Sequence, residues 1–416
     1  MSRAHALLLE NVHASASKTL QAHGVEVRRQ SKGLAEDELI GALHDLPGDG
    51  PVMVGIRSKT HITPRVFEEV PRLTAVGAFC IGTDQIALDV ARRRGVAVFN
   101  APFSSTRSVA ELVVAEVVML SRQIFSRSTA AHAGRWDKSA VGAHEVRAKT
   151  LGIVGYGHIG SQVSILAEAF GMQVIFYDID KRLPLGNANV VDSLNELLER
   201  SDFVSLHVPD TELTRGMIGK AELDSMRDGA CLLNLSRGKV VDIPALHAAL
   251  SSGKLSGASI DVYPSEPAST KETLDTELRG LDNVILTPHI GGSTQEAQAN
   301  IGNEVATALG RYLDLGSTLG GVTLPQLDLP SPAAKRPGPV SRIVNVHDNV
   351  PGVLSAINQV IAQSGVNIIG QALGTTDEVG LLFIDLPLAS DDDQAATLRK
   401  AIADMDTSVR TRLLRL

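Results

Sequence analysis

The fold of this chain is decided by the stretch Gly155-Tyr156-Gly157-His158-Ile159-Gly160, which follows an apolar run at residues 151–154. The run predicts a buried β-strand, and the glycines predict a tight turn into a helix. Gly155 permits the turn, Gly157 lets the backbone approach a pyrophosphate, and Gly160 lets the helix pack closely on the strand. The stretch therefore predicts a dinucleotide site with the phosphates at the start of the helix.

The residue that follows the next strand indicates which dinucleotide binds. Asp178 comes directly after the apolar run at residues 174–177. A carboxylate there can accept both ribose hydroxyls of NAD and would repel the 2′-phosphate of NADP. Lys181 and Arg182 follow it, and we interpret them as part of a solvated turn. NAD is therefore the expected cofactor.

Composition places the chain among soluble globular proteins. Its 416 residues suggest two or three domains, and its formal charge of −8 gives no reason to expect nucleic-acid binding. Only two cysteines are present, the apolar stretches are too short to span a membrane, and the N-terminus lacks a signal-peptide pattern. We expect a cytoplasmic protein without a metal site, whose Arg and Lys side chains gather locally if the substrate is an anion.

The chain divides into two α/β domains and a smaller C-terminal domain. A substrate-binding domain is predicted for residues 1–104 with 292–315, and an NAD-binding domain for residues 105–291. Alternating strands and helices predict a doubly wound parallel sheet in each. The first domain has predicted strands at 6–9, 52–56, 74–79 and 96–99 and a helix at 83–94; the second begins with a long apolar helix from Ser108 and has further strands at 203–207, 230–234, 258–261 and 283–286.

The C-terminal part follows a segment rich in Gly, Pro and Ser. Residues 316–339 are predicted to be a linker that is flexible near Gly320 and Gly321. Residues 340–416 are predicted to form a ferredoxin-like βαββαβ domain. Its expected elements are a strand at 341–346, a helix at 352–364, strands at 367–373 and 380–386, a helix at 393–403 and a strand at 408–414.

Three polar residues follow successive strands of the NAD-binding domain. They are Arg237, Glu266 and His289, and ligands of open α/β sheets bind beyond the carboxyl ends of the strands. Arg237 can bind a carboxylate with two hydrogen bonds. His289 can take and return a hydroxyl proton while Glu266 orients the imidazole. Each alone is an ordinary surface, turn or core residue, but together they predict chemistry on a 2-hydroxy acid.

With these residues in place, the chain resembles the D-isomer-specific 2-hydroxyacid dehydrogenases. Within that family it is most similar to bacterial members that oxidise 3-phospho-D-glycerate to 3-phosphooxypyruvate, the first step of L-serine biosynthesis, and that carry a C-terminal ACT domain. The resemblance covers essentially the whole chain. It rests on residues 57–60, 79–83, 100–104, 107–111, 155–160, 234–238, 288–297 and 347–349.

The resemblance implies a flavodoxin-like substrate domain, a Rossmann NAD domain and an ACT regulatory domain. It assigns catalysis to Arg237, Glu266 and His289. The implied NAD contacts are Gly155, Gly157, His158, Ile159, Gly160, Asp178, His207, Leu235, Ser236, Arg237, Asp261, His289, Ile290, Gly291 and Gly292. The implied substrate contacts are Arg57, Ser58, Asn100 and Gln298, and the implied effector contacts are His347, Asn349 and Asn367.

The chain departs from the family's pattern in a few places, and Lys59 is the one with a chemical consequence. A frequent arginine is replaced there by lysine, which keeps the charge but loses the two-pronged geometry. Leu235 replaces a smaller alanine, which matters little if only its backbone contacts NAD. The cluster of Arg57, Lys59 and His61 could otherwise be a solvated loop; the resemblance favours phosphate recognition.

Several alternatives remain open from the sequence. The chain could act on glycerate, lactate or another 2-hydroxy acid, reduce 2-oxoglutarate as a side activity, or be a non-catalytic NAD-sensing protein. The resemblance further implies inhibition by L-serine and a homotetramer. The tetramer would pair its NAD domains through the helix from Ser108 and its ACT domains edge to edge. Trp136 lies in a polar loop, where it suits either a subunit contact or the cap of a local core.

Overall fold

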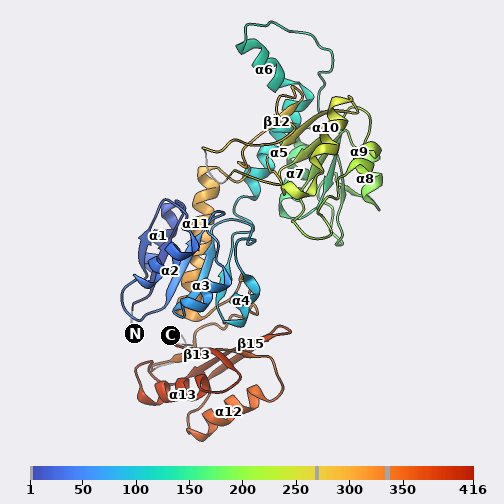
Figure 1. The fold of residues 1–416 in the computed structure, drawn as a ribbon. Helices are drawn as coiled ribbons and strands as arrows, with labels where there is room; N and C mark the ends of the chain where they lie inside the picture. The colour runs from blue at the N-terminus through green and yellow to red at the C-terminus, as the bar shows by residue number, and fades with distance from the viewer. Residues whose placement is uncertain (1–2, 268–270, 333–337) are drawn as a thin grey trace. The chain divides into compact units, whose positions relative to one another are not determined.

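The computed structural model describes residues 3–267, 271–332 and 338–416. Contacts between Cα atoms divide the chain into two compact units (Figure 1). Unit 1 comprises residues 1–104 and 298–416, and unit 2 comprises residues 105–297. Within the described residues no helix is long and apolar enough to cross a membrane.

The N-terminal part of unit 1 is built on a parallel sheet with the strand order β2-β1-β3-β4-β5. Its strands are β1 (His5–Leu8), β2 (Glu26–Arg29), β3 (Val52–Ile56), β4 (Leu73–Ala78) and β5 (Ala97–Phe99). Its helices are α1 (Ala14–Ala22), α2 (Glu36–His44), α3 (Pro64–Glu69) and α4 (Leu88–Arg93). Apolar side chains of α1 and of α11 (Gln295–Leu315) cover one face, and those of α2, α3 and α4 cover the other. The predicted doubly wound domain is confirmed.

The helix predicted at residues 83–94 is shorter in the structure. α4 spans only Leu88–Arg93, because the backbone before it pairs with a neighbouring loop. The N–H of Ile62 donates to the carbonyl of Gln85 at 2.9 Å, and the N–H of Ala87 donates to the carbonyl of Ile62 at 2.9 Å. These bonds hold residues 85–87 in an extended bridge that a helix would break.

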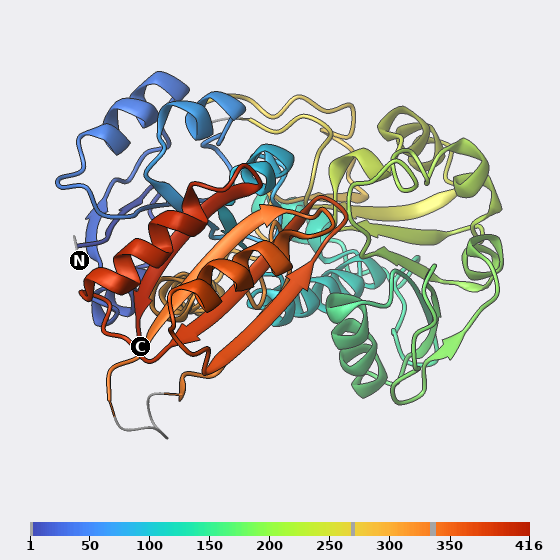
Figure 2. The ribbon, with the colours of Figure 1, turned by 90° about the horizontal axis from the view of Figure 1, so that it is seen from below.

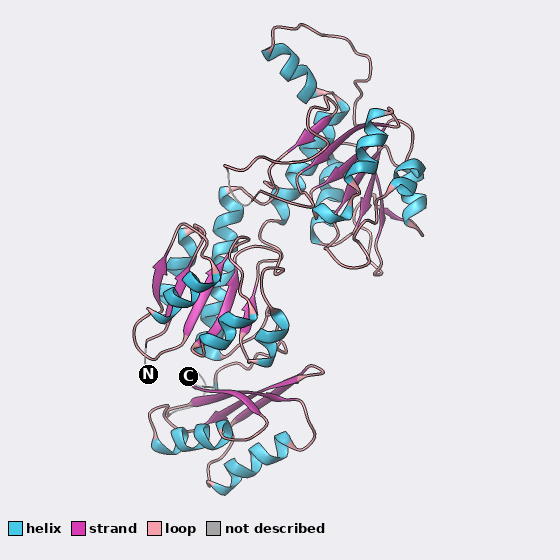
Figure 3. Ribbon diagram, viewed as in Figure 1, coloured by secondary structure: helices cyan, strands magenta, loops and turns pink. Residues whose placement is uncertain are grey.

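Unit 2 contains a seven-stranded parallel sheet with the order β12-β11-β10-β9-β6-β7-β8. Its strands are β6 (Thr150–Val154), β7 (Gln173–Tyr177), β8 (Asn189–Val190), β9 (Phe203–Leu206), β10 (Ala230–Asn234), β11 (Leu255–Ile260) and β12 (Val284–Leu286). Helices α5 (Thr106–Ser121) and α7 (His158–Ala169) bury one face of the sheet. Helices α8 (Leu194–Arg200), α9 (Lys220–Ser225) and α10 (Ile243–Ser251) bury the other (Figure 3).

One helix of unit 2 was not foreseen from the sequence. α6 (Ile124–His132) follows α5 and buries none of its residues in this chain. It extends away from the sheet of unit 2, together with the loop that follows it (Figure 1). α6 therefore adds no buried residue to unit 2.

The C-terminal part of unit 1 is an antiparallel sheet with the order β14-β15-β13-β16. It consists of β13 (Ser341–Asp348), α12 (Val353–Gln363), β14 (Gly370–Thr375), β15 (Val379–Leu386), α13 (Asp393–Ala403) and β16 (Ser408–Arg415). The predicted βαββαβ order is confirmed. Both helices lie on one face of the sheet (Figure 2), over Ile343, Leu382 and Ile384.

The other face of this sheet is buried as well. Val344, Val346 and Phe383 belong to the same apolar core as α11. Strand residues alternate between faces, so the two faces of β13 and β15 serve two separate cores. The C-terminal domain is therefore packed on the rest of unit 1.

Part of the predicted linker also differs from expectation. Thr318 and Thr323 are buried at 0% and 2% exposure. The hydroxyl of Thr323 donates to the carbonyl of Val96 at 2.9 Å, and the N–H of Val322 donates to the carbonyl of Val98 at 2.9 Å. The segment around Gly320 and Gly321 thus runs along β5 as an ordered connection rather than a flexible one. Residues 333–337 of the predicted linker lie outside the described part.

Candidate active site in unit 2

The glycine-rich turn between β6 and α7 needs glycine at two positions for steric reasons. Gly155 has φ of +90°, and a Cβ there would lie 2.4 Å from the carbonyl oxygen of His207. A Cβ on Gly160 would lie 2.2 Å from the carbonyl oxygen of Gly155. Any side chain at either position would force the turn away from the sheet.

Gly157 is different, because a Cβ there would meet no atom within 4 Å. It is the N-cap of α7, and the N–H groups of the first helical turn have no carbonyl partner within the helix. The structure therefore leaves open space in front of a helix start that favours an anion. This arrangement fits a dinucleotide pyrophosphate and agrees with NAD as the cofactor.

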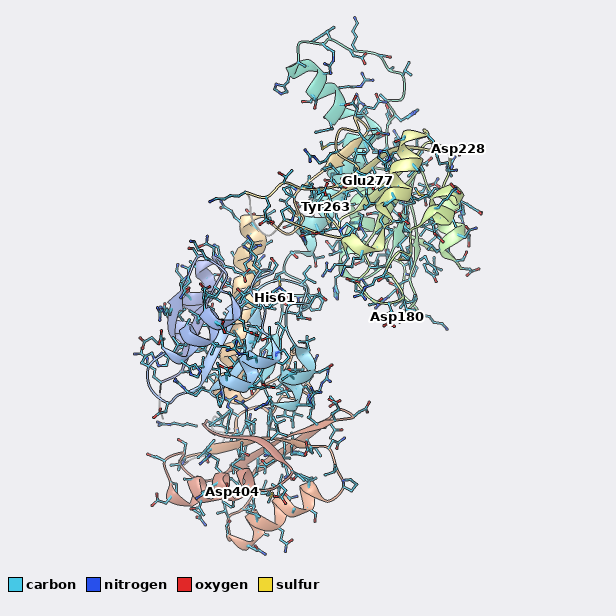
Figure 4. All side chains as sticks on the ribbon, viewed as in Figure 1. His61, Asp180, Asp228, Tyr263, Glu277 and Asp404 are labelled. Carbon is cyan, nitrogen blue, oxygen red and sulfur yellow. The ribbon has the colours of Figure 1, made fainter. Side chains whose placement is uncertain are left out.

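Asp178 ties the turn to the end of β7. Its carboxylate accepts hydrogen bonds from the N–H of Tyr156 at 2.8 Å and from the N–H of Asp180 at 2.9 Å. The guanidinium of Arg182 lies 3.6 Å from Asp178 and 2.8 Å from Asp180, which Figure 4 labels. Two carboxylates thus engage Arg182, a side chain of the kind that binds the 2′-phosphate of NADP.

His289 and Glu266 form a hydrogen-bonded pair beyond the ends of β12 and β11. The Nδ1 atom of His289 lies 2.8 Å from Oε2 of Glu266. The hydrogen bond that the imidazole donates to Glu266 raises the pKa of His289 above its ordinary value, although burial opposes it. Burial raises the pKa of Glu266, but the hydrogen bond and charge of His289, the backbone N–H of Tyr263 and the charge of Arg237 outweigh it, so the pKa is lowered overall. With Nδ1 bound to Glu266, Nε2 is left for a substrate.

The loop that carries His289 is held by Asp261. His289 has φ of +54°, a left-handed conformation that is uncommon for residues other than glycine. Asp261 is 1% exposed, and its carboxylate accepts the N–H groups of Ile290 at 2.8 Å and Gly291 at 2.9 Å. It also accepts the hydroxyl of Thr287 at 2.7 Å. Asp261 therefore fixes the loop, whether or not it also contacts NAD.

The loop that carries Arg237 packs closely on the loop that carries Glu266. Asn234, which is fully buried, donates from Nδ2 to the carbonyl of Arg237 at 3.0 Å. A Cβ on Gly238 would lie 2.0 Å from the carbonyl carbon of Tyr263, which is labelled in Figure 4. Asn234 and Gly238 belong to a segment that carries the family resemblance, but the sequence assigned them no role. Their position beside Arg237 was the available signal, but only the structure shows the contact.

Three predicted NAD contacts have their side chains turned inward. Leu235 is 6% exposed within the core under α5 and α7, and Ser236 is 8% exposed with its hydroxyl bonded to Asn234 at 2.9 Å. Their backbone atoms are what a ligand can contact. Burial lowers the pKa of His207 to about 4, so its ring is neutral near pH 7, and its Nε2 lies 2.9 Å from the hydroxyl of Ser205.

The predicted substrate residues lie in unit 1. Arg57 and Ser58 follow β3 and Asn100 follows β5, so they share the carboxyl edge of one sheet. The amide of Asn100 donates to the carbonyl of Ile81 at 2.6 Å. Gln298 lies near the start of α11. His61, which Figure 4 labels, lies in the same segment after β3 as Arg57.

The predicted effector residues are separated within one chain. His347 is 4% exposed, and its Nδ1 lies 3.0 Å from Oδ1 of Asn345. Asn349 donates to the carbonyl of Thr376, just past one end of β14, at 2.7 Å. Asn367 precedes the opposite end of β14, so one chain does not bring Asn349 and Asn367 together.

Comparison with known proteins agrees with this architecture. Residues 114–291 match the NAD-binding domain of D-isomer specific 2-hydroxyacid dehydrogenases, and residues 343–408 match an ACT domain of the AHAS small-subunit type. The structure of a D-lactate dehydrogenase from Aquifex aeolicus with NAD and lactic acid superposes with a TM-score of 0.64 at 30% identity. The match covers 74% of this chain and 95% of that one.

Relatives with assigned functions match along nearly the whole length. D-3-phosphoglycerate dehydrogenases of Haemophilus influenzae and Escherichia coli are each 48% identical over 98% of this chain, covering 96% and 97% of theirs. The chain therefore belongs to the D-isomer-specific 2-hydroxyacid dehydrogenase family of NAD-dependent enzymes. Within that family its strong similarity is to the D-3-phosphoglycerate dehydrogenases.

Proposed function

We propose that this enzyme oxidises 3-phospho-D-glycerate to 3-phosphooxypyruvate with NAD, the first step of L-serine biosynthesis. The observation that carries the proposal is the pair of His289 and Glu266, with Arg237 nearby, in a unit that fits NAD. NAD, when bound, supplies the acceptor for the hydride. The residues of the chain must then bind the acid, orient it and remove the hydroxyl proton.

The proposed roles follow from the chemistry of each side chain. Arg237 binds the carboxylate of the substrate with two hydrogen bonds and draws charge toward the oxygen that becomes the carbonyl. His289 accepts the hydroxyl proton at Nε2, and the adjacent carboxylate of Glu266 stabilises the imidazolium that results. In the reverse direction the same imidazolium donates the proton.

A phosphorylated substrate is favoured by the loop after β3. Arg57, Lys59 and His61 place basic side chains within five residues of a chain whose net charge is −8. Ser58 and Lys59 are exposed, and the loop has the hydroxyl and the cations that a phosphate requires. The loop supports Arg57 and Ser58 as substrate contacts, and the family resemblance adds Asn100 and Gln298. Reduction of 2-oxoglutarate is a side activity that the same basic loop favours, since it would bind the second carboxylate.

The substrate assignment is tested by following NADH production with 3-phosphoglycerate, D-glycerate and D-2-hydroxyglutarate. The proposal expects the highest kcat/KM with 3-phosphoglycerate. A clear preference for D-glycerate or lactate would move the enzyme to another branch of its family. No turnover with any 2-hydroxy acid, with NAD still bound, would favour the alternative of an NAD-sensing protein.

Inhibition by L-serine is proposed for the ACT domain. β14 is an edge strand, and Asn349 and Asn367 lie at its opposite ends. Pairing two copies antiparallel through β14 would bring the partner's Asn367 to the end where Asn349 lies. An amide from each copy then offers the donors and acceptors that a free amino acid needs.

A tetramer is proposed from the surfaces of both units. Ile124, Phe125, Trp136 and Val141 are 42%, 43%, 87% and 82% exposed on α6 and the loop after it. Exposed apolar side chains at this density favour a subunit contact, which would be a second interface besides β14. We propose that these two interfaces together form the tetramer. We also propose that the protein is cytoplasmic.

A further inference from the structure

Two consecutive residues after β1 have a left-handed backbone. Glu10 has φ of 57° and Asn11 has φ of 56°, although residues other than glycine seldom adopt this region. Glu10 is only 8% exposed. Such conformations persist where the surrounding structure enforces them, and they cluster at functional sites. The strained turn directs the carboxylate of Glu10 into the domain.

That carboxylate binds the backbone of the neighbouring loop. Oε2 of Glu10 accepts the N–H groups of Ser58 at 3.0 Å and Lys59 at 2.9 Å. Oε1 accepts the N–H of Thr60 at 2.8 Å. Because β1 and β3 are adjacent in the sheet, Glu10 reaches from the end of one strand to the loop that leaves the next. Hydrogen bonds to an ionised carboxylate are stronger than neutral ones.

Other contacts hold the two ends of the same loop. The side chain of Gln85 donates to the carbonyl of Arg57, and the N–H of Leu34 donates to the hydroxyl of Thr60 at 3.3 Å. A Cβ on Gly33 would lie 3.1 Å from that hydroxyl oxygen. Glu10 therefore fixes the middle of a loop whose ends are already held.

This arrangement decides how the loop can recognise an anion. Successive backbone N–H groups often form a concave anion-binding site, but here the carboxylate of Glu10 occupies it. An anionic substrate is left to the side chains of Arg57, Ser58 and Lys59, whose direction depends on the loop backbone. A displacement of about 1 Å in a positioning group can cost about 100-fold, and for groups that contact only the anionic end of the substrate we expect the cost in its KM.

We propose that Glu10 is a positioning residue for substrate recognition, which holds residues 58–60 so that Arg57 and Lys59 meet the anionic end of the substrate. The inference rests on the proposed function, which assigns phosphate recognition to this loop. For a variant without the Glu10 carboxylate, it predicts weaker binding of the anionic substrate, whereas simple electrostatics predicts tighter binding. Removing a negative charge beside two cations should tighten anion binding by Coulomb's law, whereas losing the backbone support should weaken it.

The test compares Glu10→Gln and Glu10→Asp with the control Glu26→Gln. Glutamine removes the charge and turns an N–H donor toward backbone donors, while aspartate keeps the charge but is one methylene too short. Glu26 lies exposed on β2 in the same unit, so its variant changes the net charge equally. Steady-state kinetics and hydrogen–deuterium exchange of the amides of residues 58–60 are measured on the full chain.

Both Glu10 variants are expected to raise the KM for 3-phosphoglycerate about 10-fold or more. Their kcat and KM for NAD should stay within about twofold of wild type, and the three amides should exchange faster. Glu26→Gln should change none of these. An unchanged or lowered KM for 3-phosphoglycerate would overturn the proposal. So would a rise in the KM for NAD and a fall in kcat as large as the rise in the KM for 3-phosphoglycerate, or unchanged exchange of the three amides.

Two further arrangements keep the test decisive. If the Glu10 variants do not fold, Gly33→Ala crowds the loop from the other side and should raise the same KM by a smaller factor; no rise overturns the proposal. If wild type does not oxidise 3-phosphoglycerate, the proposed function fails. The same comparison is then made with the 2-hydroxy acid that it does oxidise, and amide exchange reports on Glu10 independently of the substrate.

Discussion

At the scale of single residues, the most informative contact is the hydrogen bond between His289 and Glu266. It raises the pKa of the imidazole and lowers that of the carboxyl, so each partner favours the charged form of the other. Oxidation needs the neutral imidazole as base. The rate of oxidation should therefore rise with pH through a pKa above the ordinary value of histidine, and the rate of reduction should fall.

Removing the carboxylate reverses that shift. In Glu266→Gln the imidazole loses the partner that raises its pKa, so the rising limb of kcat/KM for oxidation moves to lower pH. The plateau should also fall by about 10-fold or more, because the ring is no longer oriented. pH–rate profiles of wild type and variant measure both effects. A limb that stays in place would mean that His289 is not the group that titrates.

The sequence predicted which residues form the catalytic site better than it predicted the contacts that hold them. Arg237, Glu266 and His289 were found because each follows a strand, and parallel strands end at one edge of a sheet. The roles of Glu10 and Gly238 were not predicted, because they depend on contacts between loops that are distant in sequence. Nothing in the local pattern distinguishes such residues from ordinary turn residues.

At the scale of elements, different glycines of the turn between β6 and α7 serve folding and NAD binding. Gly155 and Gly160 are required by the backbone around them, whereas Gly157 faces open space. Gly157→Ala should therefore fold normally but raise the Kd for NAD by about 10-fold or more, which corresponds to about 1.4 kcal/mol. Calorimetric titration with NAD and thermal unfolding measure the two properties separately.

The matched control for that prediction is Gly155→Ala. Its φ of +90° and the contact with His207 should destabilise unit 2 by about 1–3 kcal/mol. If Gly157→Ala binds NAD as tightly as wild type does, the pyrophosphate does not lie over this helix start.

A buried ion pair joins the ACT domain to α11. Nε and Nη2 of Arg342 bind the two carboxylate oxygens of Asp385 at 2.6 and 2.8 Å, and Nη1 donates to the carbonyl of Leu315 at 2.9 Å. Arg342 and Asp385 are 0% and 1% exposed and lie opposite each other on β13 and β15. The positive charge of Arg342 thus lies at the C-terminus of α11, where it stabilises the helix dipole.

Breaking this pair should be costly, because it leaves a buried charge without a partner. Arg342→Met is expected to destabilise unit 1 by about 3–5 kcal/mol, measured by denaturant unfolding. The double variant Arg342→Met with Asp385→Leu removes both charges and should recover most of that loss. Arg415→Ala, on the exposed end of β16, serves as the surface control. Equal losses in the single and double variants would contradict this account of the pair.

The predicted helices and strands agree with the structure where a local sequence pattern determines them. The βαββαβ order was readable because each strand and helix has its own apolar period. The first part of the helix predicted at residues 83–94 and the flexible segment near Gly320 were wrong for one reason. In both places backbone groups pair with a distant strand or loop, Ile62 in one case and Val98 in the other, and composition does not reveal a distant partner.

At the scale of the whole molecule, the ACT domain is packed against the rest of unit 1 rather than tethered to it. A ligand there can act only by changing the relative stability of alternative arrangements. We predict that L-serine inhibits wild type and that Asn349→Ala loses most of this inhibition while keeping its kcat without serine. Asn358→Ala, on α12 of the same domain, is the matched amide control. Equal inhibition of wild type and Asn349→Ala would place serine elsewhere.

The most direct test of the central claim compares NADH production from 3-phosphoglycerate by wild type and His289→Ala. We predict turnover by wild type and a loss of about 100-fold or more in kcat for the variant, the usual scale for a general acid–base. NAD affinity should change far less. Near wild-type kcat in His289→Ala would contradict the assignment of the proton transfer to His289 and Glu266.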